Sequence, residues 1–215
     1  MAEFFANNGE ALITAIGEHL FLSLVSLALG ILVAVPLGIL LSQVPRFANV
    51  FINIAGVLQT IPTLALLALM IPLLGVGKTP SIVALFIYSL LPILRNAYLG
   101  MVGVDPNIVD AAKGMGMSQS QVIRKVQLPL AIPVIMAGIR LSAVYVIAWA
   151  TIAAYIGGGG LGEFIFNGLQ TFRRDLIFGG TIPVIIIAIL MDLVFGYLER
   201  KLSPQTTSEV NVENA

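Results

Sequence analysis

Residues 105–129 read DPNIVDAAKGMGMSQSQVIRKVQLP and separate two long apolar stretches. Asp105 and Pro106 predict the start of a helix, because an aspartate carboxylate accepts from the first free N–H groups and proline fits the first helical position. Gly114 or Gly116 supplies the left-handed residue that ends this helix. We therefore expect a short helix and a sharp turn in a region that is otherwise apolar.

A second short helix is predicted after the glycine turn. Ser118 opens it, Gln121 lies three residues later and completes a capping box, and Pro129 is expected to close it. Each helix carries an apolar face, formed by Ile108, Val109 and Ala112 in the first and by Val122, Ile123 and Val126 in the second. We expect this helix pair to dock on another protein.

The chain as a whole has the composition of a membrane protein. Of its 215 residues, 58% are hydrophobic and 10% are charged, whereas ordinary soluble domains carry about 25% charged residues. Because a helical span needs about 20 apolar residues, the long continuous runs predict an all-α, polytopic membrane protein with about five transmembrane helices. The expected spans are Leu20–Leu41, Val50–Leu74, Ser81–Gly100, Pro133–Ile156 and Ile177–Leu198.

The same composition excludes several kinds of site. A formal net charge of zero with scattered basic residues gives no surface for nucleic acid. The absence of cysteine and the presence of a single histidine exclude a metal site built from these ligands. An intramembrane enzyme would need a nucleophile with a base, and the expected spans offer no Cys, buried His or paired carboxylates. We therefore predict no catalytic residues and no metal.

The distribution of Lys and Arg predicts the orientation, because these residues concentrate in cytoplasmic segments. With the N-terminus outside, seven basic residues fall in inner segments and three in outer ones, namely Arg46, Arg95, Lys113, Arg124, Lys125, Arg200 and Lys201 against Lys78, Arg173 and Arg174. We expect an N-terminal outer segment over residues 1–19, a transmembrane domain over 20–202 with the helix pair at about 105–129 in the cytoplasm, and a disordered cytoplasmic tail over 203–215.

The spacing of residues from Asp110 to Pro129 resembles a known motif. It is similar to the EAA loop of ABC importer permeases, E-A-A-x3-G-x9-I-x-L-P, with the matching residues Asp110, Ala111, Ala112, Gly116, Val126, Leu128 and Pro129. Asp replaces the usual Glu, and Val replaces the usual Ile. The resemblance implies the type I ABC importer permease fold, in which these residues form coupling helices that sit in a groove of the ATPase subunit.

The similarity extends from about Gly17 to Lys201 and favours one group of permeases. Residues 91–98 (LPILRNAY), 132–140 (IPVIMAGIR) and 155–162 (YIGGGGLG) resemble osmoprotectant permeases of the OpuC/OpuB type. The resemblance implies import of quaternary ammonium compounds such as glycine betaine, carnitine and choline across the plasma (inner) membrane of a prokaryote. A permease for methionine or another amino acid is the alternative within the ABC class.

No Walker A sequence is present, since Gly157–Gly160 is followed by Leu161 and not by Lys with Ser or Thr. ATP and Mg²⁺ are therefore expected at partner ATPase subunits, and this chain is expected to bind no cofactor. The family resemblance also implies a second permease subunit, homologous or identical, and an extracytoplasmic solute-binding protein. Outside the ABC class the alternative is a secondary transporter, in which the helix pair would have no purpose.

Polar and aromatic residues within the spans are candidates for the solute pathway. Gln59, Thr60 and Thr63 interrupt the second span, where they either line a pathway or mark a kinked helix whose hydroxyls bond to backbone carbonyls. Tyr145 and Trp149 offer aromatic faces that attract a quaternary ammonium through cation–π interaction, although interfacial aromatic belts use the same residue types.

Two deep charges are expected to form an intramembrane ion pair. Arg140 and Asp192 lie about 10 and 9 Å from the inner end of their spans at 1.5 Å per residue, and an unpaired charge at such depth is costly. The pair is predicted to hold two helices in register, with gating as the alternative role. On the outer side, Gly157–Gly160 is expected to form a structured loop, and His19 is expected to be an interfacial residue.

Overall fold

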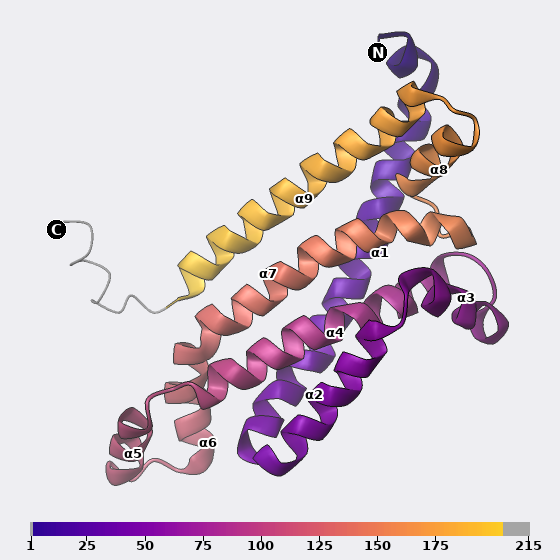
Figure 1. The fold of residues 1–215 in the computed structure, drawn as a ribbon. Helices are drawn as coiled ribbons and strands as arrows, with labels where there is room; N and C mark the ends of the chain where they lie inside the picture. The colour runs from indigo at the N-terminus through magenta and orange to yellow at the C-terminus, as the bar shows by residue number, and fades with distance from the viewer. Residues whose placement is uncertain (1, 204–215) are drawn as a thin grey trace.

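The structure, a computed structural model, describes residues 2–203, with side chains from residue 8 onward. Within this range it contains helices and no strand, which confirms the all-α expectation (Figure 1). The elements are α1 (Ala2–Gln43), α2 (Pro45–Thr60), α3 (Thr63–Leu74), α4 (Lys78–Val102), α5 (Pro106–Gly114), α6 (Gln119–Val122), the π-helical turn η1 (Ile123–Gln127), α7 (Leu128–Ala153), the 3-10 turn η2 (Ala154–Ile156), α8 (Gly162–Gln170) and α9 (Arg174–Leu202). Apart from Ser203, the tail expected to be disordered lies outside the described residues.

The long helices run between two ends of an elongated bundle (Figure 1). We call one of them the α5–α6 end, after the two short helices that lie there. The last residue of α1 lies at this end too, where Gln43 Oε1 accepts from the Gln119 side-chain Nε2 at 2.7 Å. We call the opposite one the glycine-loop end, after Gly157–Gly160. The start of α4 lies beside η2 at this end, where the Gly77 N–H donates to the Ile156 carbonyl at 3.0 Å. The helices α1, α4, α7 and α9 each join the two ends, and each belongs to a segment long and apolar enough to cross a membrane.

The second expected span, Val50–Leu74, is not a single helix. It consists of α2 and α3, which meet at a bend of 96° and together join the two ends of the bundle. Pro62 explains the break, because its ring restricts the preceding residue to extended conformations and removes one backbone donor. Ile61 is accordingly extended, with φ −64° and ψ 128°. When this bent pair is counted as one span, the structure has the five crossings that the sequence predicts.

The first helix begins well before the expected span Leu20–Leu41. α1 runs from Ala2 to Gln43 and so includes most of the segment that was expected to lie outside the membrane. The polar residues near its start mark where hydropathy falls, but hydropathy does not determine where a helix ends. The outer segment over residues 1–19 is therefore largely an extension of the first helix.

α4 lies at the centre of the bundle and packs against α1 and α7, while α9 packs on α7. Glycines allow these helices to approach closely. A Cβ added to Gly38 of α1 would lie 2.6 Å from the Ala97 Cβ of α4, and one added to Gly138 of α7 would lie 2.5 Å from the Asn96 Cβ. Small residues at such crossings permit the backbone packing that drives helix association in membranes.

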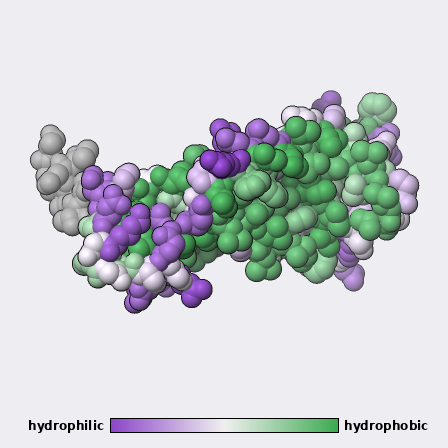
Figure 2. Space-filling view, turned by 90° about the horizontal axis from the view of Figure 1, so that it is seen from below, coloured by the Kyte–Doolittle hydropathy of each residue, from purple (hydrophilic) through white to green (hydrophobic). Residues whose placement is uncertain are grey.

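The outer surface of the bundle is largely hydrophobic (Figure 2). Hydrophilic residues gather at the end that holds α5 and α6, on the left of the figure, whereas hydrophobic residues cover much of the length. Large exposed side chains on α2, α3 and α9 contribute to this surface, including Phe51, Leu69 and Ile189. Such a surface suits contact with lipid, because apolar side chains cover helices whose backbone groups are already hydrogen-bonded internally.

Candidate functional site

The two short helices begin at the residues that the sequence predicts. The Asp105 carboxylate accepts from the Asn107 N–H at 2.8 Å at the start of α5. At the start of α6, the Ser118 N–H donates to Gln121 Oε1 at 2.8 Å, as in a capping box. Both helix starts therefore depend on contacts between residues that are two or three positions apart.

Gly116, and not Gly114, supplies the left-handed residue between the helices. Its φ is +82°, whereas Gly114 is the last helical residue of α5. The Met117 N–H donates to the Ala112 carbonyl at 3.2 Å, and the Gly116 N–H donates to the Lys113 carbonyl at 2.9 Å. These are the two hydrogen bonds of a Schellman motif, so the turn satisfies the backbone groups at the end of α5.

The expectation that Pro129 closes the second helix is wrong. α6 continues through η1 into α7, and Pro129 lies in the first turn of α7. A proline has no N–H to donate, and the π-helical turn just before it takes up the change in hydrogen-bond register. The Leu128 N–H, for example, donates to the Ile123 carbonyl five residues back. The segment Gln119–Ile156 is therefore one continuous helical segment of 38 residues.

Part of the apolar surface expected to dock on a partner is used inside the segment itself. Ala112 is 2% exposed and Val122 is fully buried, and α5 packs against α6 and η1. The remaining motif residues near the junction with α7 are half-buried, namely Val126, Leu128 and Pro129. These residues hold the α5–α6 segment to the end of α7.

Other residues of the segment remain open to a partner. Asp110 and Ala111 are exposed, and Lys113 Nζ lies 3.4 Å from Asp110 Oδ1 on the same surface. Ile108 is 45% exposed and Met115 is 72% exposed. Met115 was not predicted as a contact residue, because its position in the turn falls outside the helical periodicity that marked the apolar faces.

An aromatic cluster lies next to the break between α2 and α3. The ring centroids of Tyr88 and Trp149 are 4.7 Å apart, and those of Tyr145 and Trp149 are 5.3 Å apart. The Tyr88 hydroxyl donates a hydrogen bond to the carbonyl of Ile61, the extended residue at the break. Sequence reasoning missed Tyr88, although a lone tyrosine inside an apolar span requires a partner for its hydroxyl.

The polar residues around the break differ in their surroundings. Thr60 is exposed, and its hydroxyl donates to the Val57 carbonyl at 2.7 Å, which is the local bonding expected of a kinked helix. Gln59 and Thr63 are half-buried. The structure thus brings the candidates Trp149 and Tyr145 close to the break through Tyr88.

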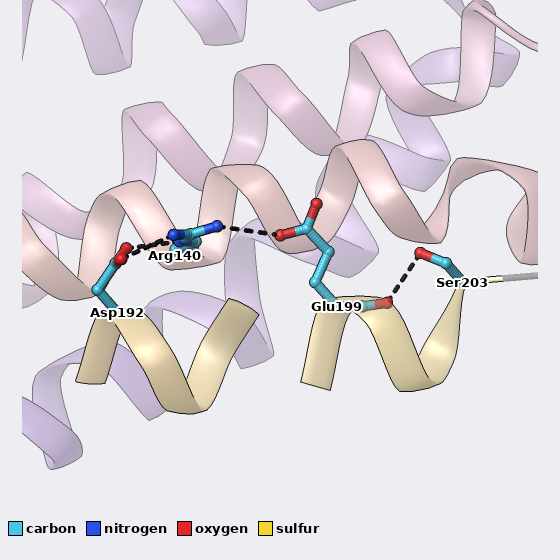
Figure 3. A network of polar contacts seen from close by, with 4 residues as sticks. All are labelled: Arg140, Asp192, Glu199 and Ser203. Atoms are coloured by element: carbon cyan, nitrogen blue, oxygen red, sulfur yellow. Dashed lines mark hydrogen bonds and ion pairs between the residues drawn. The ribbon is translucent and has the colours of Figure 1, made fainter. Parts of the chain in front are cut away.

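Arg140 and Asp192 lie against each other on α7 and α9 (Figure 3). Arg140 Nε donates to Asp192 Oδ1 at 2.5 Å, and Arg140 Nη2 donates to Asp192 Oδ2 at 2.7 Å, which makes the pair bidentate. Glu199 lies about two helical turns after Asp192 on α9, and its Oε2 is 3.7 Å from Arg140 Nη1. Gly196 leaves room for the guanidinium, since a Cβ there would lie 3.3 Å from Nη1. The guanidinium therefore lies along α9 between two carboxylates.

The loop Gly157–Gly160 is held against α1 and α4. Gly157, Gly159 and Gly160 have positive φ angles. The Gly160 N–H donates to Glu18 Oε2 at 3.1 Å, and Lys78 Nζ lies 2.8 Å from Glu18 Oε1. The loop is thus structured, as expected. Within the described residues, no group of three or more His, Asp or Glu side chains is placed to hold a metal ion.

The expectation that His19 is an interfacial residue is wrong. Its side chain is fully buried, and its Nε2 lies 3.1 Å from the Ile147 carbonyl oxygen of α7. A Cβ added to Gly160 would lie 3.3 Å from the His19 ring, so the glycine loop closes over the histidine. This packing could not be predicted from the sequence, because both contacts come from residues far along the chain.

Comparison with known proteins reveals similar chains over nearly the whole sequence. The carnitine transport permease protein OpuCB of Listeria monocytogenes is 57% identical over 96% of this chain and 94% of its own length. The glycine betaine/carnitine/choline transport system permease protein OpuCB of Bacillus subtilis is 52% identical over 95% and 94%. The choline transport system permease protein OpuBB of the same organism is also 52% identical, over 95% and 94%.

Solved structures share the fold. The inward-facing MetNI methionine ABC transporter contains a chain that superposes with a TM-score of 0.80, covering 90% of this chain and 96% of that one at 21% sequence identity. The expected permease fold is therefore confirmed. The model of the family described as the inner membrane component of binding-protein-dependent transport systems matches residues 21–204. This chain belongs to that family, and it is a multi-pass membrane component of an ABC importer and not an enzyme.

Proposed function

We propose that this chain is the permease subunit of an importer for quaternary ammonium osmoprotectants, with carnitine, glycine betaine and choline as the solutes to test. The observation that carries the proposal is the 57% identity, over 96% of the chain, to a carnitine transport permease. The aromatic cluster supports the same solute class, because an aromatic face attracts a quaternary ammonium by about 0.5–2 kcal/mol.

In this proposal Tyr145 and Trp149 contribute to the solute pathway together with Gln59, Thr60 and Thr63. Tyr145 is 39% exposed and stacks on Trp149, so a cation entering from the exposed side would meet its ring first. The break in the second span supplies backbone and hydroxyl groups nearby, and irregular backbone within a membrane is tolerated where it lines a water-filled cavity.

The α5–α6 segment is proposed to dock on an ABC ATPase subunit, and that subunit would bind ATP and Mg²⁺. Its docking surface would be formed by Asp110, Ala111, Ile108 and Met115, all of which are exposed. The remaining motif residues, including Gly116 and Pro129, would keep the segment rigid. The complete transporter would also contain a second permease subunit and an extracytoplasmic solute-binding protein.

The α5–α6 end is proposed to face the cytoplasm of a prokaryotic cell, with the N-terminus outside. Basic residues support this orientation, because Lys and Arg favour cytoplasmic segments. Residues at or near the α5–α6 end include Arg46, Lys113, Arg124, Lys125, Arg200 and Lys201, whereas those at the glycine-loop end are Lys78, Arg173 and Arg174.

The ion pair of Arg140 with Asp192 is proposed to hold α7 and α9 in register. Both side chains come from helices that pack together, and two parallel hydrogen bonds fix their relative position. A charge within the membrane is costly without such a partner.

Uptake into proteoliposomes tests the proposed function. The complex, reconstituted with its ATPase and binding protein, is supplied in turn with labelled carnitine, glycine betaine, choline and methionine. ATP-dependent uptake of one or more of the first three is the expected result. Uptake of methionine alone would overturn the solute class, and uptake that persists without the ATPase would indicate a secondary transporter.

A further inference from the structure

The residues of α2 divide its surface into three faces. At 3.6 residues per turn, Ala48 and Ala55 share one face, and both are buried against the bundle. A second face carries large apolar side chains that are between 52% and 65% exposed, namely Phe47, Val50, Ile54 and Val57. The third face, between the other two, is polar. We call it the polar stripe, and it consists of Asn49, Asn53, Gly56 and Thr60.

The polar stripe is poorly suited to lipid. Asn49 and Asn53 are exposed, and neither side-chain amide has a hydrogen-bond partner among the described residues. An amide that is moved from water into hydrocarbon loses its hydrogen bonds at a large cost. The neighbouring apolar face of the same helix suits lipid instead. The stripe therefore requires a polar neighbour, which is water, a polar solute or a polar surface of another subunit.

The stripe leads directly to the aromatic cluster. It ends at Thr60, and the Tyr88 hydroxyl bonds to the carbonyl of the next residue, Ile61. From Asn49 to Thr60 the helix rises about 16 Å at 1.5 Å per residue, which is roughly half of the 30 Å hydrocarbon core. The stripe thus covers the distance between the cluster and the α5–α6 end.

We infer that the polar stripe lines the half of the solute pathway between the aromatic cluster and the α5–α6 end. Asn49 and Asn53 hydrogen-bond there to the polar groups of a passing zwitterion, or to its water, while the aromatic cluster receives its quaternary ammonium. This inference rests on the proposed function and extends it to residues near the exit of the pathway.

The absence of cysteine from the chain makes a sharp test available. Single variants Asn49→Cys and Asn53→Cys are compared with Val50→Cys and Ile54→Cys, which lie at nearly the same depths on the apolar face. Each variant is assembled into the complete transporter in vesicles that expose the α5–α6 side. A membrane-impermeant methanethiosulfonate that carries a trimethylammonium group is then added. Labelling after denaturation in detergent gives the total of reactive thiol for normalisation.

The expected result is labelling at least about tenfold faster in the two asparagine variants, because only a hydrated thiol ionises and reacts readily. Saturating glycine betaine should slow their labelling and leave the apolar pair unaffected. Equal rates on the two faces would overturn the inference. A disulfide between two copies of the Asn53→Cys chain, without labelling, would also overturn it, because the stripe would then be a subunit contact.

Uptake by the unlabelled complexes separates this inference from the proposed function. If the complexes transport none of the quaternary ammonium solutes but the stripe is still labelled preferentially, the solute class is wrong and the pathway assignment stands. If they transport these solutes and the stripe is not labelled, the pathway assignment is wrong and the proposed function stands.

Discussion

Replacing Gly116 with alanine is expected to weaken the turn between α5 and α6, whereas the same change at Gly114 is expected to stabilise α5. Gly116 has φ +82°, and an added Cβ at either position meets no atom of the surroundings within 4 Å. The two changes therefore differ only in backbone conformation. A residue with a Cβ costs about 1–2 kcal/mol in the left-handed region, whereas alanine is favoured over glycine within a helix by about 0.5–1 kcal/mol.

Hydrogen exchange at the Met117 amide measures this difference, because that N–H donates to the Ala112 carbonyl across the turn. Exchange through local opening reports the free energy of the opening, and 1.4 kcal/mol corresponds to a factor of ten. Exchange should thus be about 5–30 times faster in Gly116→Ala and no faster than wild type in Gly114→Ala. If the turn couples transport to the ATPase, ATP-driven uptake should fall in Gly116→Ala alone. Equal exchange in Gly116→Ala and wild type would refute the assigned conformation.

Four further substitutions and one double variant test the packing of the bundle through the thermal unfolding of the purified complex. Gly138→Val would place atoms against Asn96, whose Cβ lies 2.5 Å from the position of an added Cβ. Such overpacking costs about 1–3 kcal/mol and should lower the midpoint of thermal unfolding. An unchanged midpoint would contradict the close approach of α4 and α7. Arg140→Gln should lower the midpoint more than the double variant Arg140→Gln/Asp192→Asn does, because the single change leaves both Asp192 and Glu199 without the guanidinium, whereas the double change also removes one of these two charges; additive effects of the two substitutions would argue against coupling between Arg140 and Asp192. Tyr88→Phe removes the hydrogen bond at the break in the second span and should destabilise the protein by about 0.5–1.5 kcal/mol, so a midpoint equal to that of wild type would place this hydroxyl in water.

The features that the sequence predicts well are those whose partners lie nearby in the chain. Asp105 caps α5 through a residue two positions away, and the turn at Gly116 closes through the Gly116 N–H, whose acceptor carbonyl lies three positions back, and the Met117 N–H, whose acceptor carbonyl lies five positions back. The five crossings were likewise predictable, because hydropathy over about 20 residues reflects the thickness of the membrane. Pro129 was misjudged because the rule for the residue before proline assumes an α-helical register, and a π-helical turn precedes it here.

The features that escaped prediction depend on contacts distant in sequence. His19 is buried and its Nε2 contacts the carbonyl of Ile147, 128 positions away, and Glu18 accepts from the N–H of Gly160, 142 positions away. Tyr88 acquires its role only because Ile61, 27 positions earlier, exposes a carbonyl at the break. The pair of Arg140 with Asp192, also distant in sequence, was nevertheless predictable, because two isolated charges at similar depth in a membrane have few other partners.

The continuity of α6, η1 and α7 has a mechanical consequence for the proposed coupling. A break in the helix at Pro129 would have absorbed a displacement of the α5–α6 segment, but the helical segment continues without a break from Gln119 to Ile156. The same helical segment carries Arg140, which is bonded to Asp192 of α9, and Trp149, which belongs to the aromatic cluster. A partner that moves the segment would therefore move the ion pair and the cluster with it. Because packed helices rearrange between discrete states and do not deform continuously, we expect such a displacement to open the proposed pathway beside the cluster in a single step.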